Sequence, residues 1–146
     1  MYKELIAKCI EGNEWAKLQK PCSEREISKA EKIVGYAFPK ELKDLLRETN
    51  GDNNLLLSAK QIIENVNRNR KILSEAYDDI EKYREKVDRH IFFATDGCGN
   101  YFCYRILPDG TADTSAICFW DHETDDCEPV ANNIADMIVK YYNGEI

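Results

Sequence analysis

Histidine is scarce in this chain: among 146 residues there are only two, His90 and His122. Acid–base pairs and zinc centres often depend on histidine, so few such sites can be assembled. The sequence also has no P-loop, no serine-centred nucleophile elbow and no paired-histidine metal motif. Its glycine-rich turn, 97–99, joins two predicted strands and opens no helix, so it lacks the context of a phosphate-binding loop. These absences predict a protein that is not an enzyme and uses no cofactor.

Long apolar runs are also absent. No stretch approaches the roughly 20 apolar residues of a membrane span, and residues 1–9 contain no apolar core of a signal peptide. We therefore expect a cytoplasmic protein with no membrane contact, in which thiols stay reduced. The length fits one domain, 1–146, with enough residues for a core of its own.

The six cysteines do not show the spacing of a zinc site. Such sites usually present two close ligand pairs, whereas here the closest pair, Cys98 and Cys103, is separated by four residues and no second pair follows. Cys103 and Cys118 fall in apolar strand-like runs and are predicted to fill the core. The spacing therefore predicts no metal site.

Positive charge is in short supply. The chain has 20 basic and 27 acidic residues and a net charge of −7, which argues against direct binding of nucleic acid. The deficit is local, because residues 109–146 contain nine acidic side chains and a single base, Lys140, giving −8. This asymmetry indicates either a surface for a basic partner or a chance cluster on a solvated face.

The first half of the chain has helical patterns. A capping box pairs Ser23 with Glu26, and a stripe at Leu42, Leu45, Leu46 and Thr49 has helical spacing. The first expected helix covers 2–19, with Leu5, Cys9, Trp15 and Leu18 inward. Two more helices are expected, from Ser23 to Val34 and from Phe38-Pro39 to Asn50-Gly51, followed by a short strand over 55–57. A last helix over 58–89 begins with a Ser58–Gln61 capping box and is expected to break at 65–69.

The second half has strand patterns, followed by one helix. Strands are predicted over 90–94, 101–106 and 116–120, and the final helix is capped by Asn132 or Asn133. Helices first, then sequential strands with short connections, then a helix is typical of an α+β domain with a largely antiparallel sheet.

One acidic cluster follows the third predicted strand. Acidic side chains at a rigid strand end can pair with Arg and Lys of a partner and speed its approach. Tyr101 could anchor such an interface, and so could Trp120, although the latter ends an apolar strand and reads as core. The candidate partner-binding residues are Tyr101, Asp121, His122, Glu123, Asp125, Asp126 and Glu128. A less favoured alternative is a metal or thiol enzyme centred on His122 with Cys98 or Cys127.

Several motifs, in this order and spacing, resemble the SUKH superfamily (the Smi/Knr-type domain). They are Ser23-Glu24-Arg25-Glu26-Ile27, Phe38-Pro39-Lys40-Glu41-Leu42, Thr49-Asn50-Gly51, Phe92-Phe93-Ala94, Gly97-Cys98-Gly99-Asn100-Tyr101 and Ile117-Cys118-Phe119-Trp120 with Asp121-His122-Glu123. The resemblance covers about 22–142. Relatives often place Asp where Asn100 and Arg105 stand here, which puts any shared role of those acids in doubt.

The resemblance implies a single α+β domain with a curved sheet packed by helices, no catalytic residue and no cofactor. Many bacterial members look like immunity proteins that neutralise a polymorphic toxin, often a nuclease. The leading hypothesis is therefore an immunity protein whose partner is a cognate toxin with a basic surface. The alternative is a regulatory adaptor that binds a cellular protein, as fungal relatives do.

Overall fold

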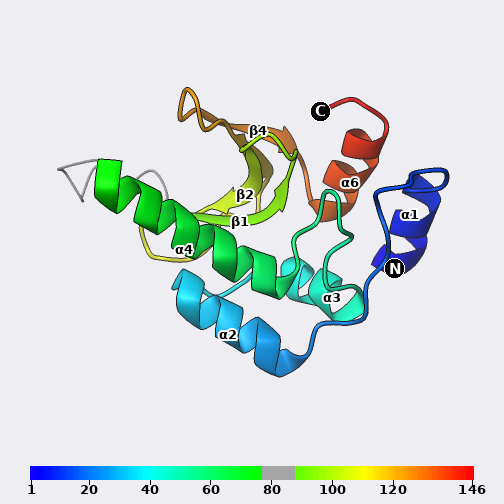
Figure 1. The fold of residues 1–146 in the computed structure, drawn as a ribbon, viewed down its shortest axis with the longest axis horizontal. Helices are drawn as coiled ribbons and strands as arrows, with labels where there is room; N and C mark the ends of the chain where they lie inside the picture. Colours follow the sequence, from blue (N-terminus) through cyan, green and yellow to red (C-terminus); the bar gives the residue numbers. More distant parts are fainter. Residues whose placement is uncertain (77–87) are drawn as a thin grey trace.

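The computed structural model describes residues 1–76 and 88–146 (Figure 1). Its elements, in chain order, are α1 (Tyr2–Cys9), α2 (Glu24–Val34), α3 (Lys40–Glu48), α4 (Ala59–Ala76), β1 (His90–Thr95), β2 (Tyr101–Arg105), β3 (Ile117–Trp120), β4 (Cys127–Ala131) and α6 (Ile134–Tyr142).

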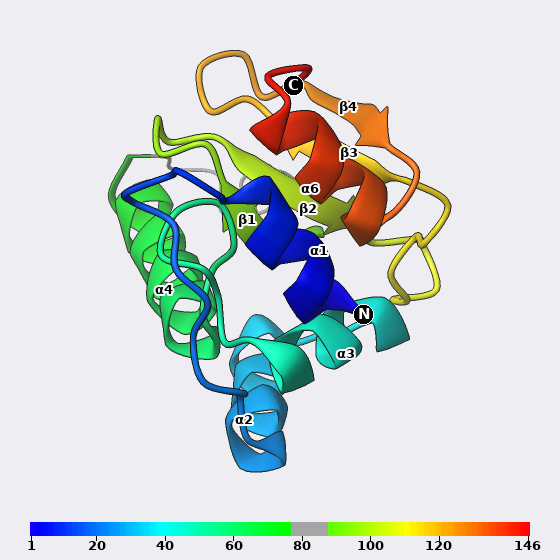
Figure 2. The same cartoon turned by 90° about the vertical axis from the view of Figure 1, so that its right-hand side faces the viewer.

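The four strands form one sheet in the order β1-β2-β3-β4, and every neighbouring pair is antiparallel. The sheet is curved, and α1 and α6 lie on its convex side (Figures 1 and 2). Helix α4 packs along α2 below the sheet. The predicted α+β architecture with a curved antiparallel sheet is confirmed.

The two faces of the sheet carry different side chains. On the face toward α3 and α6, Phe102 meets Tyr141 edge-on at 5.9 Å between ring centroids, and the hydroxyl of Tyr104 donates to Glu41 Oε1 at 2.5 Å. On the opposite face, the rings of Phe92, Tyr101 and Trp120 contact one another, with centroids 4.7–6.1 Å apart. Strand pairing thus places one set of rings against the helices and leaves the other set to line the concave side.

The local helix signals are confirmed. Ser23 Oγ accepts from the backbone N–H of Glu26, whose carboxylate accepts in turn from the backbone N–H of Ser23. Ser58 and Gln61 make the same reciprocal pair at the start of α4. At the final helix, Asn133 rather than Asn132 provides the cap, by accepting from the N–H of Asp136.

The predicted first helix is too long. Helix α1 ends at Cys9, and Gly12 then adopts a left-handed conformation at φ 77°. The side chain of Asn13 accepts from the N–H groups of Trp15 and Ala16, a local turn that replaces helical hydrogen bonds. Trp15 is consequently 78% exposed instead of buried, and the buried residues of α1 are Tyr2 and Ile6.

The predicted break at 65–69 is also wrong, because α4 runs without interruption from Ala59 to Ala76. Two contacts hold this stretch in place. Val66 is buried in the core, and the guanidinium of Arg70 donates to the carbonyls of Ile33 and Val34 at the end of α2, at 2.8 and 3.0 Å. The same guanidinium pairs with Asp88 at 2.9 Å. Residues 77–87 of the predicted helix lie outside the described residues.

Two edges of the sheet differ from expectation. The predicted strand over 55–57 is buried and hydrogen-bonds to β1, but it forms only a single bridge, between Leu56 and Ala94. Strand β4, which the sequence did not predict, pairs with β3 and contains Glu128 and Pro129, both exposed. A proline and an exposed charge are tolerated there because β4 is an edge strand.

Candidate functional site

The acidic cluster forms the turn between β3 and β4 and the start of β4; we call residues 121–128 the acidic hairpin. Its backbone is closed by hydrogen bonds from Asp125 N to Asp121 O and from Asp121 N to Asp126 O, at 2.8 and 2.9 Å. Asp125 has a left-handed backbone, φ 64°. The indole N–H of Trp120 donates to Asp125 Oδ1 at 2.9 Å. The turn is therefore a fixed structure and not a loose loop.

His122 ties the acidic hairpin to the turn between β1 and β2. Both its backbone N–H and its Nδ1 contact Asn100 Oδ1, at 3.1 and 2.7 Å. Because that amide oxygen only accepts, Nδ1 carries the proton. The imidazole also lies against Gly99, where an added Cβ would be 3.2 Å from the ring, and Gly99 has φ 90°. Glycine at this position thus allows the two turns to meet.

Asn100 uses both ends of its side-chain amide. Its Nδ2 donates to Asp96 Oδ2 at 2.9 Å while its Oδ1 accepts from His122. An aspartate here would have no N–H for Asp96 and would place two carboxylates together, which is repulsive. The amide therefore suits this pair of turns.

The predicted partner-binding acids have two different surroundings. Asp121 Oδ1 accepts from the N–H of Glu123, and Asp125 accepts from the indole of Trp120, so both are half-buried and shape the turn. The other predicted residues of the hairpin are exposed: His122, Glu123, Asp126 and Glu128. The exposed group is the part of the hairpin that a partner can reach.

Tyr101 is placed differently from its predicted role as an interface anchor. It is only 5% exposed, because it lies among Phe92 and Trp120, and its hydroxyl accepts from Arg68 of α4 at 3.3 Å. A side chain so covered offers almost no surface to a partner. Tyr101 therefore supports the sheet beneath the acidic hairpin and is left out of the proposed interface.

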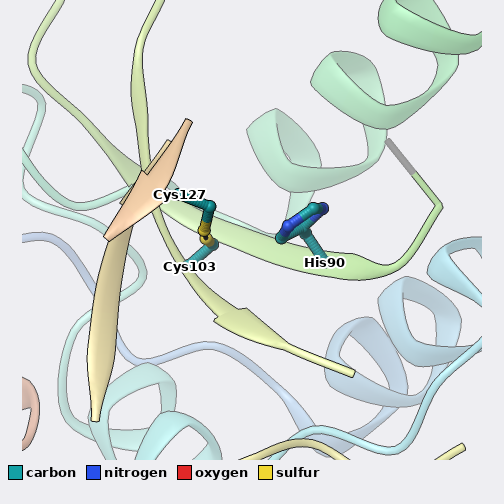
Figure 3. Close-up of side chains that lie close together, drawn as sticks. All are labelled: His90, Cys103 and Cys127. Carbon is teal, nitrogen blue, oxygen red and sulfur yellow. Dashed lines mark hydrogen bonds between the residues drawn. The ribbon is translucent and has the colours of Figure 1, made fainter. Parts of the chain in front are cut away.

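The alternative thiol site was centred on His122 with Cys98 or Cys127. In the structure His122 Nδ1 bonds to Asn100, and Cys98 is exposed in the β1–β2 turn. The sulfur of Cys127 instead lies 3.7 Å from that of Cys103, and the imidazole of His90 stands beside this pair (Figure 3). The residues that converge are thus different from those suggested by sequence.

We call His90, Cys103, Cys118 and Cys127 the Cys–His cluster. One ring nitrogen of His90 and the sulfurs of Cys103 and Cys127 all lie within 4.8 Å of one another. Cys118 pairs with Cys103 across β2 and β3 and so stands on the same face. Cys103 and Cys118 are buried in the core, as predicted, and they are also neighbours in this cluster. Spacing along the chain could not indicate it, since each residue comes from a different strand.

The thiols of this cluster differ in the direction of their pKa shifts. Hydrogen bonds from Cys103 and Cys118 hold the pKa of the Cys127 thiol well below its usual range, and His90 and Arg105 act in the same direction. Burial raises the pKa of Cys103, and the bond to Cys127 adds to that rise. The pKa of Arg105 is raised, and its interaction with Cys127 is the main cause.

Comparison with known families gives a match to the SMI1 / KNR4 family (SUKH-1) over residues 21–140. The match covers most of the chain. The chain belongs to the SMI1 / KNR4 family (SUKH-1). No curated protein matches it. Domains of this family are commonly immunity proteins and are generally non-catalytic. In the described part of this SUKH-1 domain, no helix is long and apolar enough to cross a membrane.

Replacing Asn100 by alanine should loosen the two joined turns of this SUKH-1 domain. The substitution removes the acceptor of His122 and the donor to Asp96, so we expect the free energy of unfolding to fall by about 1–2 kcal/mol. The NMR resonances of the His122 ring should move toward those of a solvated imidazole. Asn67→Ala, at an exposed position of α4, is the matched control and should change neither quantity by much. Unchanged His122 resonances in Asn100→Ala would contradict the hydrogen bond between His122 and Asn100.

Proposed function

We propose that this protein is an immunity protein that neutralises a cognate toxin, with a nuclease as the favoured class, by covering its working surface. The first support is membership of a family whose domains are commonly immunity proteins. The observation that carries the proposal on this chain is the acidic hairpin, whose exposed carboxylates stand on a turn fixed by Trp120 and Asn100. A fixed acidic surface loses little entropy on binding and is therefore well suited to a protein partner.

Charge gives the partner its expected chemistry. Residues 109–146 carry −8, and Glu123, Asp126 and Glu128 present carboxylates at the surface. Nucleases bind phosphates through Lys and Arg, so carboxylates in the same places would compete with the substrate. Complementary charge also steers encounter and raises association rates by roughly 10- to 10³-fold. The proposed partner is thus a toxin whose substrate-binding surface is basic.

Co-expression tests the proposal directly. The toxin encoded in the adjoining gene should kill cells alone, and co-expression of this protein should restore growth and give a complex that co-purifies. Continued killing with no complex would overturn the proposal. A complex with a cellular protein instead, in the same pull-down, would favour the regulatory adaptor.

Charge reversal on the acidic hairpin should slow the association with that toxin. Asp126→Lys with Glu128→Lys changes two exposed side chains, and we expect the association rate at low salt to fall by about tenfold, with a weaker dependence on salt. Stopped-flow or surface-based kinetics at several salt concentrations would measure this. Asp125 is left unchanged because it holds Trp120.

The control variant makes the same charge change elsewhere. Glu11→Lys with Glu14→Lys alters exposed residues in the segment after α1, across the molecule from the β3–β4 turn (Figure 1). If steering depends on the hairpin, the control should lose far less of the association rate. Equal losses in the two variants would show that only net charge matters and would remove the hairpin from the interface.

A further inference from the structure

The register of the sheet brings the Cys–His cluster to one face. Directly paired residues share a face, as do residues two apart along a strand. Phe92 pairs with Cys103, Cys103 pairs with Cys118, and Trp120 pairs with Cys127. His90 stands two residues before Phe92, and Cys118 two before Trp120. All four members therefore stand on the concave side, and Figure 3 shows three of them converging.

The spacing of the sulfurs fits a shared metal ion. Zinc–sulfur bonds of about 2.3 Å in a tetrahedral site place two sulfurs about 3.8 Å apart. The sulfurs of Cys103 and Cys127 are 3.7 Å apart. A disulfide would instead require about 2.05 Å. The imidazole nitrogen of His90, within 4.8 Å of both sulfurs, occupies a third corner of such a site without large movement.

A buried ring nitrogen of His90 also supports a metal ion at this site. Nδ1 of His90 is buried and has no hydrogen-bond partner among the residues that the structure describes. A buried ring nitrogen without a partner is costly, and native proteins nearly always satisfy it. Coordination through one ring nitrogen would give the imidazole a strong interaction and would fix its orientation.

The surroundings match the charge of a thiolate site. Three thiolates, a neutral imidazole and a divalent ion sum to −1. The positive charge of Arg105, which pairs with His90 across β1 and β2, can balance that charge. Sulfur and nitrogen ligands select zinc-like ions over magnesium or calcium.

We propose that His90, Cys103 and Cys127 bind a zinc-type divalent ion. Cys118, which pairs with Cys103 on the same face of the sheet, would turn its sulfur toward the ion as the fourth ligand. Burial of Cys103 and Cys118 makes this a closed, structural site and not a catalytic one. The ion would join all four strands at one point. It would also fix Cys127, the first residue of β4, directly after the turn of the acidic hairpin.

Metal binding by the full-length reduced protein tests the proposal. After chelation and desalting, added Zn²⁺ should bind at one equivalent and raise Tm by about 5–10 °C. Added Co²⁺ should give the thiolate-to-metal absorption and the intense visible bands of a tetrahedral site. Elemental analysis, differential scanning fluorimetry and absorption spectroscopy read out these effects independently of any partner.

Matched variants localise the site. Cys127→Ala, at a half-buried position, should weaken Co²⁺ binding at least tenfold and abolish the rise in Tm, while Cys98→Ala, at an exposed thiol outside the cluster, should leave both intact. Cys118→Ala should retain weakened binding with altered visible bands. Absence of stoichiometric metal at micromolar Zn²⁺, or equal binding by Cys127→Ala and wild type, would overturn the proposal. So would a Cys103–Cys127 disulfide on oxidation in a protein that binds no metal when reduced.

Discussion

Asp52→Ala should lower the free energy of unfolding by about 3–4 kcal/mol. Asp52 is fully buried, and its carboxylate accepts three hydrogen bonds. Oδ1 accepts from the N–H groups of Leu56 and Asn54 at 2.7 and 3.0 Å, and Oδ2 accepts from the hydroxyl of Tyr142 at 2.5 Å. Removing the acceptor leaves buried donors without partners, and that cost is larger than the net value of the bonds themselves.

The effect follows from what Asp52 connects. Its side chain links the loop before residues 55–57 to the end of α6, and its backbone carbonyl accepts from Lys17 at 2.7 Å. Burial raises the pKa of Tyr142, and the bond to Asp52 adds to the rise, so this hydroxyl remains a donor across the physiological range. The carboxylate of Asp52 therefore joins two segments far apart in the sequence, and the backbone carbonyl of the same residue joins a third.

Two milder variants separate the contributions. Asp52→Asn keeps an acceptor oxygen for the backbone and should lose about half as much stability as Asp52→Ala. Tyr142→Phe removes a single donor and should cost about 1–2 kcal/mol. Urea denaturation of the purified proteins gives all three values. A loss below 1 kcal/mol in Asp52→Ala, or equal losses in the Ala and Asn variants, would show that the carboxylate does not hold these segments.

Gly51→Ala should cost about 3 kcal/mol or more. Gly51 has φ 83°, a left-handed conformation in which a non-glycine residue loses about 1–2 kcal/mol. An added Cβ would also lie 2.8 Å from the backbone nitrogen of Ser58 and 2.9 Å from the carbonyl oxygen of Leu56. Those atoms belong to the backbone of the buried 55–57 segment and of Ser58, the residue before α4, so moving them would disturb the core.

Gly110→Ala provides the matched control. Gly110 has a similar φ of 88°, but a Cβ there would meet nothing within 4 Å. The control should therefore lose only about 1 kcal/mol, the cost of the left-handed conformation alone. The difference between the two variants in urea denaturation, about 2 kcal/mol, measures the close backbone approach. Equal losses would mean that the approach at Gly51 relaxes without cost.

Sequence predicted the elements whose signals are local. The capping box at Ser23 and Glu26 and the stripe of Leu42, Leu45 and Leu46 depend only on neighbours along the chain, and both are confirmed. Strand β4 was missed because Glu128 and Pro129 carry no strand signal; it exists through pairing with β3. The continuity of α4 was missed for a similar reason, since α2, through its bonds with Arg70, helps to hold it.

The two candidate sites differ in how much of them a sequence can reveal. The acidic hairpin is contiguous, so its charge is visible in the chain, although the division into exposed and turn-forming carboxylates is not. The Cys–His cluster is assembled from positions 13 to 37 residues apart along the chain, measured from His90 to Cys103 and to Cys127. Only the strand register places them together, and no short spacing motif can report it.

Neither edge of the sheet favours the addition of a further strand. Beside β1, residues 55–57 use two of its outer hydrogen-bonding groups, the carbonyl of Phe93 and the N–H of Thr95. Along β4, Pro129 has no N–H to offer, and exposed Glu128 would bring its charge against an incoming strand. Recognition by adding a peptide strand to this sheet is therefore disfavoured. Side chains on the turns would then determine which partner is bound. Substitutions there can change the choice of partner while the hydrogen bonds of the sheet stay the same.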